Sequence, residues 1–368
     1  MTRLRGAEST STNNPWTKGT AVKTGNDSIE MRRLATKVAW LYHERGLRQG
    51  EIGDRLGISQ SRVSRLLDMA TSLGIVRTVV VPPPDLHADL EVSLEELYGL
   101  EEAHVFDVGA LDDTELTGSL GRCLAMVLQT RSFDAEVIGL TSWSRSLREM
   151  IDALDPLKTT GTRYVVEMLG DVGPPQVQHA AALATSQLAA LTGAEPMFLR
   201  VSGVSPTPEL RMNLIEGNHH AQTLLTMLDH VDVALVGVGT CEIVEPLTAG
   251  DNFFTKAQFA SVAERGAVGQ VNLRFIDANG LPVVSELDDL IVGITLEQLS
   301  RARSRFGVAG GASKYEAIRA TLLGQWLTLL VTDVVTARWL IANHPSVPGR
   351  VEGADRVERS RAAGAAVD

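Results

Sequence analysis

Apolar residues recur at helical spacing in two neighbouring segments near the N-terminus of the chain. On the first segment, Ile52 and Leu56 lie four positions apart. On the second, four apolar residues follow positions i, i+3, i+4 and i+7, and so share one helix face: Val63, Leu66, Leu67 and Ala70. Between the segments, Gly57 permits a sharp turn and Ser59 is a favourable N-cap. The pattern predicts two short helices joined by a tight turn, as in a helix-turn-helix.

The second of these helices carries polar side chains on its outward face. Gln and Arg pair bidentately with adenine and guanine edges, whereas hydroxyls more often contact the DNA backbone. We therefore expect a recognition helix whose N-terminal end contacts bases or backbone and whose Arg65 contacts phosphate; the residues at that end are Ser59, Gln60, Ser61 and Arg62. Residues 74–81 favour a β wing on which Arg77 touches phosphate. The alternative is a solvated pair of helices without a DNA-binding role.

Beyond three prolines at Pro82, Pro83 and Pro84, short β-rich apolar runs alternate with helical stretches. Consecutive prolines continue neither a helix nor a strand, so they mark a boundary. Strands are expected at residues 104–108, 137–140, 164–169, 197–201, 231–238, 271–276, 306–309 and 327–331. Helices are expected between several of them, for example at 177–191, 258–265 and 314–323. Such alternation predicts βαβ units, a mostly parallel sheet and a ligand outside the carboxyl ends of its strands.

The domain organisation follows from these segments. We expect a disordered leader at residues 1–30, a helix-turn-helix domain at 31–84, an α/β effector-binding domain at 85–345 and a disordered tail at 346–368. Four leucines at helical spacing begin the large domain: Leu86, Leu90, Leu94 and Leu97. Their helix either caps that domain or forms a dimer seam.

The net charge of −11 is distributed unevenly over the 368 residues. Residues 1–81 carry 13 basic and seven acidic side chains, whereas the rest of the chain carries 21 basic and 38 acidic ones. DNA binding depends on neutralising phosphates with Lys and Arg. The asymmetry is therefore typical of a basic DNA-binding head on an acidic body.

Two further features bear on the cell compartment and on cofactors. No run of roughly 18 apolar residues and no signal-peptide core is present. Cys123 and Cys241 have neither a CxxC partner nor metal-ligand spacing. We therefore expect a cytoplasmic protein that contacts no membrane and holds no metal or other cofactor.

Clustered hydroxyl groups follow the expected strand that ends near Leu140. Thr141, Ser142, Ser144 and Ser146 crowd this loop, and together with backbone N–H groups at a helix start they predict an anion cradle. Arg145 adds positive charge. Trp143, in the same loop, either stacks on a sugar or is buried in the core.

A second candidate for phosphate binding lies near residue 310. Gly310 and Gly311 let the backbone approach a ligand, and Lys314 supplies a point charge at the start of a helix. The alternative for Lys314 is an ordinary solvated lysine. Gly237 and Gly239 suggest half of a dinucleotide-binding motif, but Glu242 stands where the third glycine belongs, which argues against NAD.

The order of several motifs resembles the SorC family of sugar-binding transcriptional regulators, from about residue 35 to residue 341. The head carries Ser61-Arg-Val-Ser-Arg-Leu-Leu and Gly74-Ile-Val. The body carries Leu94-Glu-Glu-Leu-Tyr-Gly-Leu, Gly139-Leu-Thr-Ser-Trp-Ser-Arg-Ser-Leu, Val236-Gly-Val-Gly, Gly266-Ala-Val-Gly-Gln-Val-Asn-Leu-Arg-Phe-Ile-Asp, Val292-Gly-Ile-Thr-Leu-Glu-Gln-Leu, Val308-Ala-Gly-Gly-Ala-Ser-Lys-Tyr-Glu-Ala-Ile and Leu330-Val-Thr-Asp-Val-Val-Thr-Ala.

The resemblance implies a Rossmann-like effector domain similar to sugar-phosphate isomerases and deaminases. It also implies a phosphorylated sugar or polyol as effector, a tetramer, and a ligand-contacting role for Lys314. Two positions depart from the family pattern. Gln270 stands where many relatives have Asp, and Asp171 follows Gly170 where relatives have a second glycine. Asp171 is suited to sugar hydroxyls, so the effector is either a phosphorylated sugar or an uncharged polyol.

Three functions are compatible with this sequence. The first is a regulator whose affinity for double-stranded operator DNA is controlled by a small carbohydrate, and it is the one we expect, without enzyme activity. The second is a sugar-phosphate isomerase or deaminase with an added DNA-binding head, which requires a positioned general base. The third is an architectural DNA-binding protein that uses the large domain only for oligomerisation.

Overall fold

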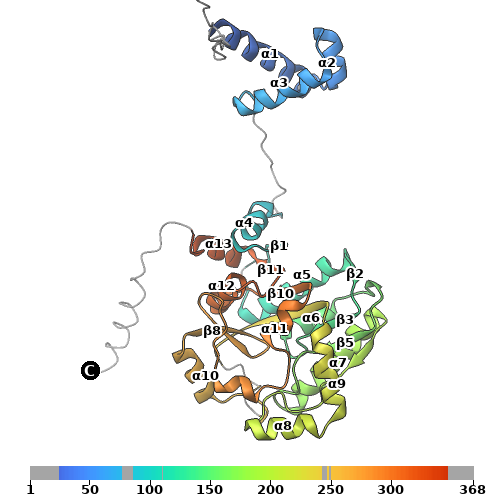
Figure 1. Cartoon of the computed structure of the whole chain (residues 1–368), viewed down its shortest axis with the longest axis vertical. Helices are drawn as coiled ribbons and strands as arrows, with labels where there is room; N and C mark the ends of the chain where they lie inside the picture. Colours follow the sequence, from blue (N-terminus) through green and yellow to red (C-terminus); the bar gives the residue numbers. More distant parts are fainter. Residues whose placement is uncertain (1–24, 77–85, 110, 243–246, 248–249, 347–368) are drawn as a thin grey trace, which may run out of the picture. The chain divides into compact units, whose positions relative to one another are not determined.

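The computed structural model describes residues 25–76, 86–109, 111–242, 247 and 250–346, and it divides the chain into two compact units, Met1–Val81 and Pro82–Asp368. The first unit holds α1 (Gly25–His43), α2 (Gln49–Leu56) and α3 (Gln60–Ser72). These helices lie side by side (Figure 1), and Ile52, Val63 and Leu66 are buried in their shared core. Gly57 ends α2 with a φ of +66°, as the turn requires. The expected pair of helices with its tight turn is confirmed.

Three expectations for this unit need comment. Helix α1 begins at Gly25, so residues 25–30 belong to a helix and not to a disordered leader. Ser59 is the N-cap residue of α3, but its hydroxyl contacts the Ser61 hydroxyl at 3.1 Å and caps no backbone N–H group. Most of the expected wing, including Arg77, lies outside the described residues.

The second unit is built on a parallel sheet with the strand order β1-β11-β10-β7-β3-β5-β6. A two-stranded parallel sheet, β2-β4, stands apart from it. The strands are β1 (Glu102–Phe106), β2 (Ser132–Asp134), β3 (Val137–Leu140), β4 (Lys158–Thr160), β5 (Tyr164–Glu167), β6 (Glu195–Met197), β7 (Val233–Thr240), β8 (Ala267–Val271), β9 (Arg274–Asp277), β10 (Ser304–Val308) and β11 (Leu329–Asp333). The predicted α/β class is confirmed.

Helices connect the strands and cover both faces of the sheet. They are α4 (Ala88–Tyr98), α5 (Asp113–Gln129), α6 (Arg145–Asp152), α7 (Pro175–Thr192), α8 (Pro208–Glu216), α9 (His219–Met227), η1 (Leu228–His230), α10 (Lys256–Glu264), η3 (Glu286–Leu290), α11 (Leu296–Arg301), η4 (Ala312–Lys314), α12 (Tyr315–Leu323) and α13 (Val334–Ala342). On β7, Val233 and Leu235 join one core cluster, whereas Ala234 and Val236 join the other. Alternate residues of one strand thus face opposite layers of helices.

Two strand predictions are wrong in detail. The run at 271–276 was expected to form one strand, but the chain reverses at Asn272 and Leu273, where φ is +49° and +62°. β8 and β9 therefore form an antiparallel hairpin, and β8 pairs with the end of β7. The strand expected at 197–201 is β6, which ends at Met197. Residues after Met197 form isolated bridges, such as the bridge of Ser202 with Asp171.

Candidate effector cavity and DNA-reading helix

A cavity of about 380 Å³ opens at the carboxyl edge of the sheet, where β3 and β7 are neighbours. In the sheet, β5 and β6 lie on the far side of β3, whereas β10 and β11 lie on the far side of β7, so the strand order reverses between β3 and β7. Ligands of open α/β sheets bind at such a switch point. Six of the predicted effector-binding residues line this cavity: Thr141, Trp143, Ser144, Arg145, Gln270 and Lys314.

Positive charge gathers on one part of the cavity wall. The Lys314 ammonium group makes no hydrogen bond or ion pair with any other described residue. Burial holds the pKa of Lys314 below its ordinary value; Asp113 opposes this shift, and Arg145 adds to it. Arg148 also lines the cavity, and its buried Nε has no partner among the described residues. Neither Lys314 nor Arg148 forms an ion pair with another described residue, which favours an anionic ligand.

Helix α6 begins at this same wall. Its N-cap residue is Ser144, whose hydroxyl contacts the Ser146 hydroxyl at 3.1 Å and leaves the backbone N–H groups of the first turn uncapped. Both serines line the cavity. Free N–H groups and the helix dipole attract anions at a helix N-terminus. Three of the four clustered hydroxyls, those of Thr141, Ser144 and Ser146, thus line the same cavity as Lys314, and their role as an anion cradle stays a prediction.

Two glycines of β7 make room for polar side chains. A Cβ atom at Gly237 would lie 2.9 Å from the Ser144 Oγ atom, and one at Gly239 would lie 1.9 Å from the Gln270 Nε2 atom. The Gly237-Val-Gly239 motif thus has a steric role in this cavity. Gln270 is buried, and its Oε1 atom accepts a hydrogen bond from the Leu273 N–H group at 2.8 Å.

Three predicted residues lie outside this cavity, around a separate space of about 10 Å³. They are Ser142, Gly170 and Asp171. Asp171 accepts a hydrogen bond from Arg200 at 2.7 Å, and the neighbouring Glu167 is buried. Burial raises the pKa of both carboxyls, and Arg200 opposes the shift. A space of this size holds about one water molecule, so contacts of these residues with the effector remain a prediction.

Gly310 and Gly311 do not line the cavity either, but they shape the loop that carries Lys314. A Cβ atom at Gly310 would lie 2.3 Å from the Asp333 Oδ2 atom. Gly311 has a φ of +95°, and its N–H group donates to the Thr336 hydroxyl at 3.0 Å. Their role in the described structure is close backbone packing, and direct ligand contact stays a prediction.

Trp143 is partly buried, so it fits neither sequence interpretation completely. Its ring packs edge-on against Phe253, with centroids 6.4 Å apart. The indole Nε1 atom is buried without a partner among the described residues. The ring lines both the cavity and the smaller space, so it forms the partition between them.

Several lining residues were not predicted from the sequence. They are Asp113, Thr114 and Thr117 from α5, Arg148 from α6, and Leu247, Phe253 and Phe259. Asp112 caps α5 through the Thr114 and Glu115 N–H groups, a local signal that was available. No local pattern places α5 beside α6, because these helices meet only when β1 and β3 take their places in the sheet.

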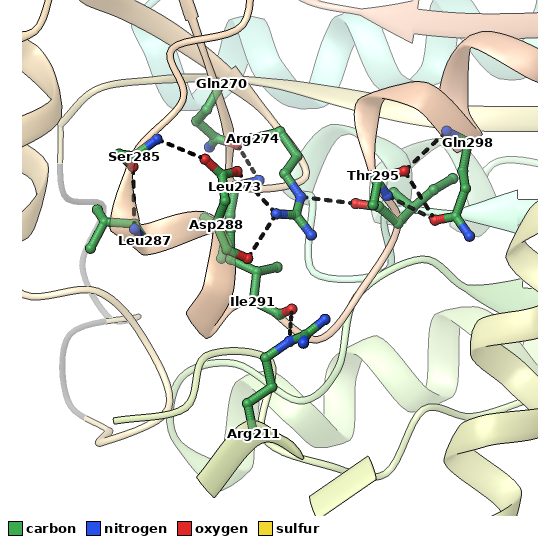
Figure 2. Close-up of polar contacts among 11 residues, drawn as sticks. Arg211, Gln270, Leu273, Arg274, Ser285, Leu287, Asp288, Ile291, Thr295 and Gln298 are labelled. Atoms are coloured by element: carbon green, nitrogen blue, oxygen red, sulfur yellow. Dashed lines mark hydrogen bonds and ion pairs between the residues drawn. The ribbon is translucent and has the colours of Figure 1, made fainter. Parts of the chain in front are cut away.

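Phe253 and Phe259, which line the cavity, belong to a core cluster that includes residues of β8, β9 and η3. The buried side chain of Arg274 connects these elements. Figure 2 shows Arg274, on β9, donating to the Ile294 carbonyl at 3.1 Å and to the Asp288 carboxylate at 3.0 Å. Asp288 also accepts from the Ser285 N–H group at the start of η3. Arg274 thereby ties the β8–β9 hairpin to η3 and to the segment before α11, next to the cavity.

The recognition helix presents its predicted residues to solvent. Gln60, Ser61, Arg62 and Arg65 are exposed on α3, whereas Val63, Leu66 and Ala70 are buried. Arg65 Nε donates to the Ser61 carbonyl at 3.3 Å, which holds its guanidinium along the helix. DNA contact by these residues, and by Ser59, stays a prediction.

The described residues contain neither a candidate metal-binding cluster nor a candidate membrane-spanning helix. Within these residues, no group of three or more His, Cys, Asp or Glu side chains could hold a metal ion. None of the helices described is long and apolar enough to cross a membrane.

A helix-turn-helix unit and an α/β unit with a cavity at its strand ends define a class of protein in which one chain holds a DNA-binding and a ligand-binding part. Comparisons with known proteins agree. Residues 83–342 match the family described as "putative sugar-binding domain". The deoxyribonucleoside regulator of Bacillus subtilis is 30% identical over 85% of this chain and 98% of its own. The sorbitol operon regulator of Klebsiella pneumoniae is 28% identical over 84% of this chain and 98% of its own.

The structure comparison gives the same answer. The full-length sorbitol operon regulator SorC from Klebsiella pneumoniae aligns with a TM-score of 0.63 and 27% identity, covering 85% of this chain and 99% of that one. The chain therefore belongs to the SorC-type family of sugar-binding transcriptional regulators. It is a DNA-binding regulator of transcription under effector control.

Proposed function

We propose that the cavity binds a small phosphorylated sugar or polyol with its phosphate at the N-terminus of α6. The observation that carries this proposal is the convergence on one wall of three cations that form no ion pair among the described residues: Lys314, Arg145 and Arg148. Cavity-lining carboxylates from Asp113 and Glu242 leave a formal excess of one positive charge. Lys, Arg and helix N-terminal N–H groups are the usual phosphate ligands in proteins.

The remaining wall suits the carbon skeleton and hydroxyls of a carbohydrate. Trp143 and Phe253 offer apolar ring surfaces, and the Gln270 amide and Thr240 hydroxyl offer hydrogen-bonding groups. Pockets of this kind combine apolar walls with a few placed polar groups. The acidic pair Glu167 and Asp171 behind Trp143 disfavours a second anion on that side, so we assign a single phosphate to the effector.

Binding would favour one arrangement of the regulator and thereby change its affinity for operator DNA. Ser59, Gln60, Ser61 and Arg62 would contact bases or backbone, and Arg65 would contact phosphate. Arg77 is proposed for the same role from the sequence alone. We further propose that the chain acts in the cytoplasm as a homo-oligomer, a tetramer by family resemblance, and that it does not transform its effector.

The experiment that tests this is a thermal-stability screen against sugars, polyols and their phosphates, because a ligand that binds only the folded state must raise Tm. Phosphorylated compounds should raise Tm, and Lys314→Ala should abolish the rise. Lys158→Ala, which removes an exposed lysine outside the cavity, is the matched control and should leave it unchanged.

The outcomes separate the candidate functions. A rise in Tm with unphosphorylated polyols alone would refute the phosphate assignment. Consumption of the stabilising compound would favour the enzyme, with Asp113 or Glu242 as the base to test, since both carboxylates line the cavity. If no compound raises Tm, the result would favour the third function, in which the large domain serves only for oligomerisation.

A further inference from the structure

The loop that carries Lys314 is bonded directly to helix α13. The Gly311 N–H group donates to the Thr336 hydroxyl at 3.0 Å, and that hydroxyl donates to the carboxylate of Asp333, the N-cap of α13. Tyr315, the residue after Lys314, stacks on Trp339 of the same helix with ring centroids 4.7 Å apart. Thr336 is fully buried, so water does not compete for these bonds. A displacement of this loop therefore acts on α13.

The other partner of α13 is helix α4. The Tyr98 hydroxyl donates to the Leu340 carbonyl at 2.8 Å in a buried position. Leu94 and Tyr98 are buried against the core that includes Leu340. Helix α4 is thus a cap of the large domain, and α13 is the element on which it rests.

Helix α4 is also fastened to the edge of the sheet. Glu91 and Glu95, one helical turn apart, accept hydrogen bonds from the Val105 and Ala103 N–H groups at 2.9 Å each. These N–H groups belong to β1, whose ladder partner in the sheet is β11. The two carboxylates satisfy the outer edge of β1, so any shift of α4 is resisted by charge-assisted bonds.

The two contacts of α13 lie one helical turn apart. Thr336 and Leu340 are four residues apart, which corresponds to a rise of about 6 Å on the same face of the helix. Residues 310–314 carry the cavity lysine, and α4 is the first helix of the large unit, directly after the segment that follows the DNA-binding unit. One path from the cavity to that segment thus passes through a single turn of α13.

We propose that α13 couples the cavity to α4, with Thr336 and Tyr98 as the positioning residues at its two contacts. The proposal rests on the proposed function, because the signal begins when an anion engages Lys314. That engagement restrains residues 310–314, the Thr336 bond restrains α13, and the Tyr98 bond restrains α4. Coupling of two sites through an element that both restrain is an allosteric effect.

The test is hydrogen exchange of α4 in the full-length chain, with ribose 5-phosphate, sorbitol 6-phosphate and inorganic phosphate as probes. In the parent protein, a probe that raises Tm should also slow exchange of the α4 amides. In Thr336→Val and in Tyr98→Phe the rise in Tm should persist, whereas the added protection of α4 should be lost.

Two control variants match these substitutions. Thr321→Val removes a hydroxyl that is equally buried but bonds only to the Ala317 carbonyl of its own helix. Tyr164→Phe removes a hydroxyl that accepts from Arg163, away from both contacts of α13. Both control variants should retain the response of α4. Two independent test variants keep the proposal falsifiable if one of them does not fold.

The outcomes are distinct. If a probe raises Tm but α4 protection changes equally in the parent and in both test variants, coupling through α13 is wrong while the proposed function stands. The same holds if α4 in the parent does not respond. If no probe raises the Tm of the parent, the proposed function fails, and the coupling proposal fails with it.

Discussion

The Thr141 hydroxyl donates a hydrogen bond to the Asn272 Oδ1 atom at 2.9 Å, between residues 131 positions apart in the sequence. The bond joins the loop after β3 to the turn of the β8–β9 hairpin. Both turn residues, Asn272 and Leu273, have positive φ values, which non-glycine residues rarely adopt. Tertiary contacts must therefore hold this turn. The Leu273 N–H group of the turn also fixes the Gln270 side chain in the cavity.

We expect Thr141→Val to destabilise the fold and weaken effector binding. The substitution leaves the buried Asn272 Oδ1 atom without its donor, and an unsatisfied buried group costs about 1–3 kcal/mol. Urea unfolding, followed by fluorescence, measures the change. Thr321→Val is the control, because its buried hydroxyl lies outside the cavity and bonds only to the Ala317 carbonyl of its own helix. Equal stability of the two variants would contradict a tertiary role for the Thr141 bond.

Lys314→Met should raise the Tm of the unliganded protein and abolish its stabilisation by phosphate compounds. Burial lowers the pKa of Lys314, so the folded state disfavours its charged form. Stability therefore falls as pH drops from the ordinary pKa of a lysine to the lowered pKa, and the full cost is present below it. Removing the charge relieves this cost at neutral pH. A Tm below that of the parent would show that the charge of Lys314 does not destabilise the unliganded fold.

The effector affinity should also depend on pH through Lys314. Phosphate binding requires the charged amine, so affinity should fall as pH rises through the lowered pKa, in a range below that of an ordinary lysine. Lys314→Arg should keep its affinity across that range, because an arginine does not lose its proton there. Isothermal titration calorimetry at several pH values measures this, and identical pH profiles would refute it.

Gln270→Glu should change the preference between charged and uncharged ligands. The glutamate carboxylate has the length of the glutamine side chain and preserves the acceptor for the Leu273 N–H group, but it places a negative charge in the cavity. Phosphorylated compounds should bind about tenfold more weakly or worse, equivalent to about 1.4 kcal/mol, whereas uncharged polyols should not. An equal loss of affinity for phosphorylated and uncharged compounds would mean that Gln270 affects binding only by holding the β8–β9 hairpin in place.

Two arginines of α3 should affect DNA binding differently. Arg62→Ala should cost about 1–3 kcal/mol at one base position and relax selectivity there, whereas Arg65→Ala should weaken binding to all sequences and reduce the salt slope by about 1. Fluorescence anisotropy with operator and random DNA at several salt concentrations measures both. Equal affinity of the parent for the two DNAs would overturn both predictions.

The helix-turn-helix could be predicted because its signals are local. The turn at Gly57 and the inward face of Val63, Leu66 and Ala70 depend on residues within one or two helical turns. Strand positions were also predictable, since β1, β3, β5, β7, β10 and β11 lie within two residues of the expected runs. Buried parallel strands are continuous apolar runs, whatever their neighbours are.

Part of the cavity could be predicted for the same reason. The loop Thr141–Arg145 and Lys314 follow strands directly, and parallel strands bring their carboxyl ends to one edge. The hairpin at residue 272 could not be predicted, because a bond from Thr141, 131 positions away in the sequence, holds its turn. The ion pair of Asp171 with Arg200 could not be predicted either, and contact of Asp171 with the effector stays a prediction.

The sequence by itself thus determined the two units, the parallel sheet and the edge of the sheet at which the cavity lies. It did so because hydrophobic periodicity and turn residues act over a few positions. Only the tertiary structure decided which charges meet: Lys314 with Arg145 and Arg148 in the cavity, and Asp171 with Arg200 outside it. These groups lie far apart in the sequence, and strand order alone sets the distances that govern their electrostatic interactions.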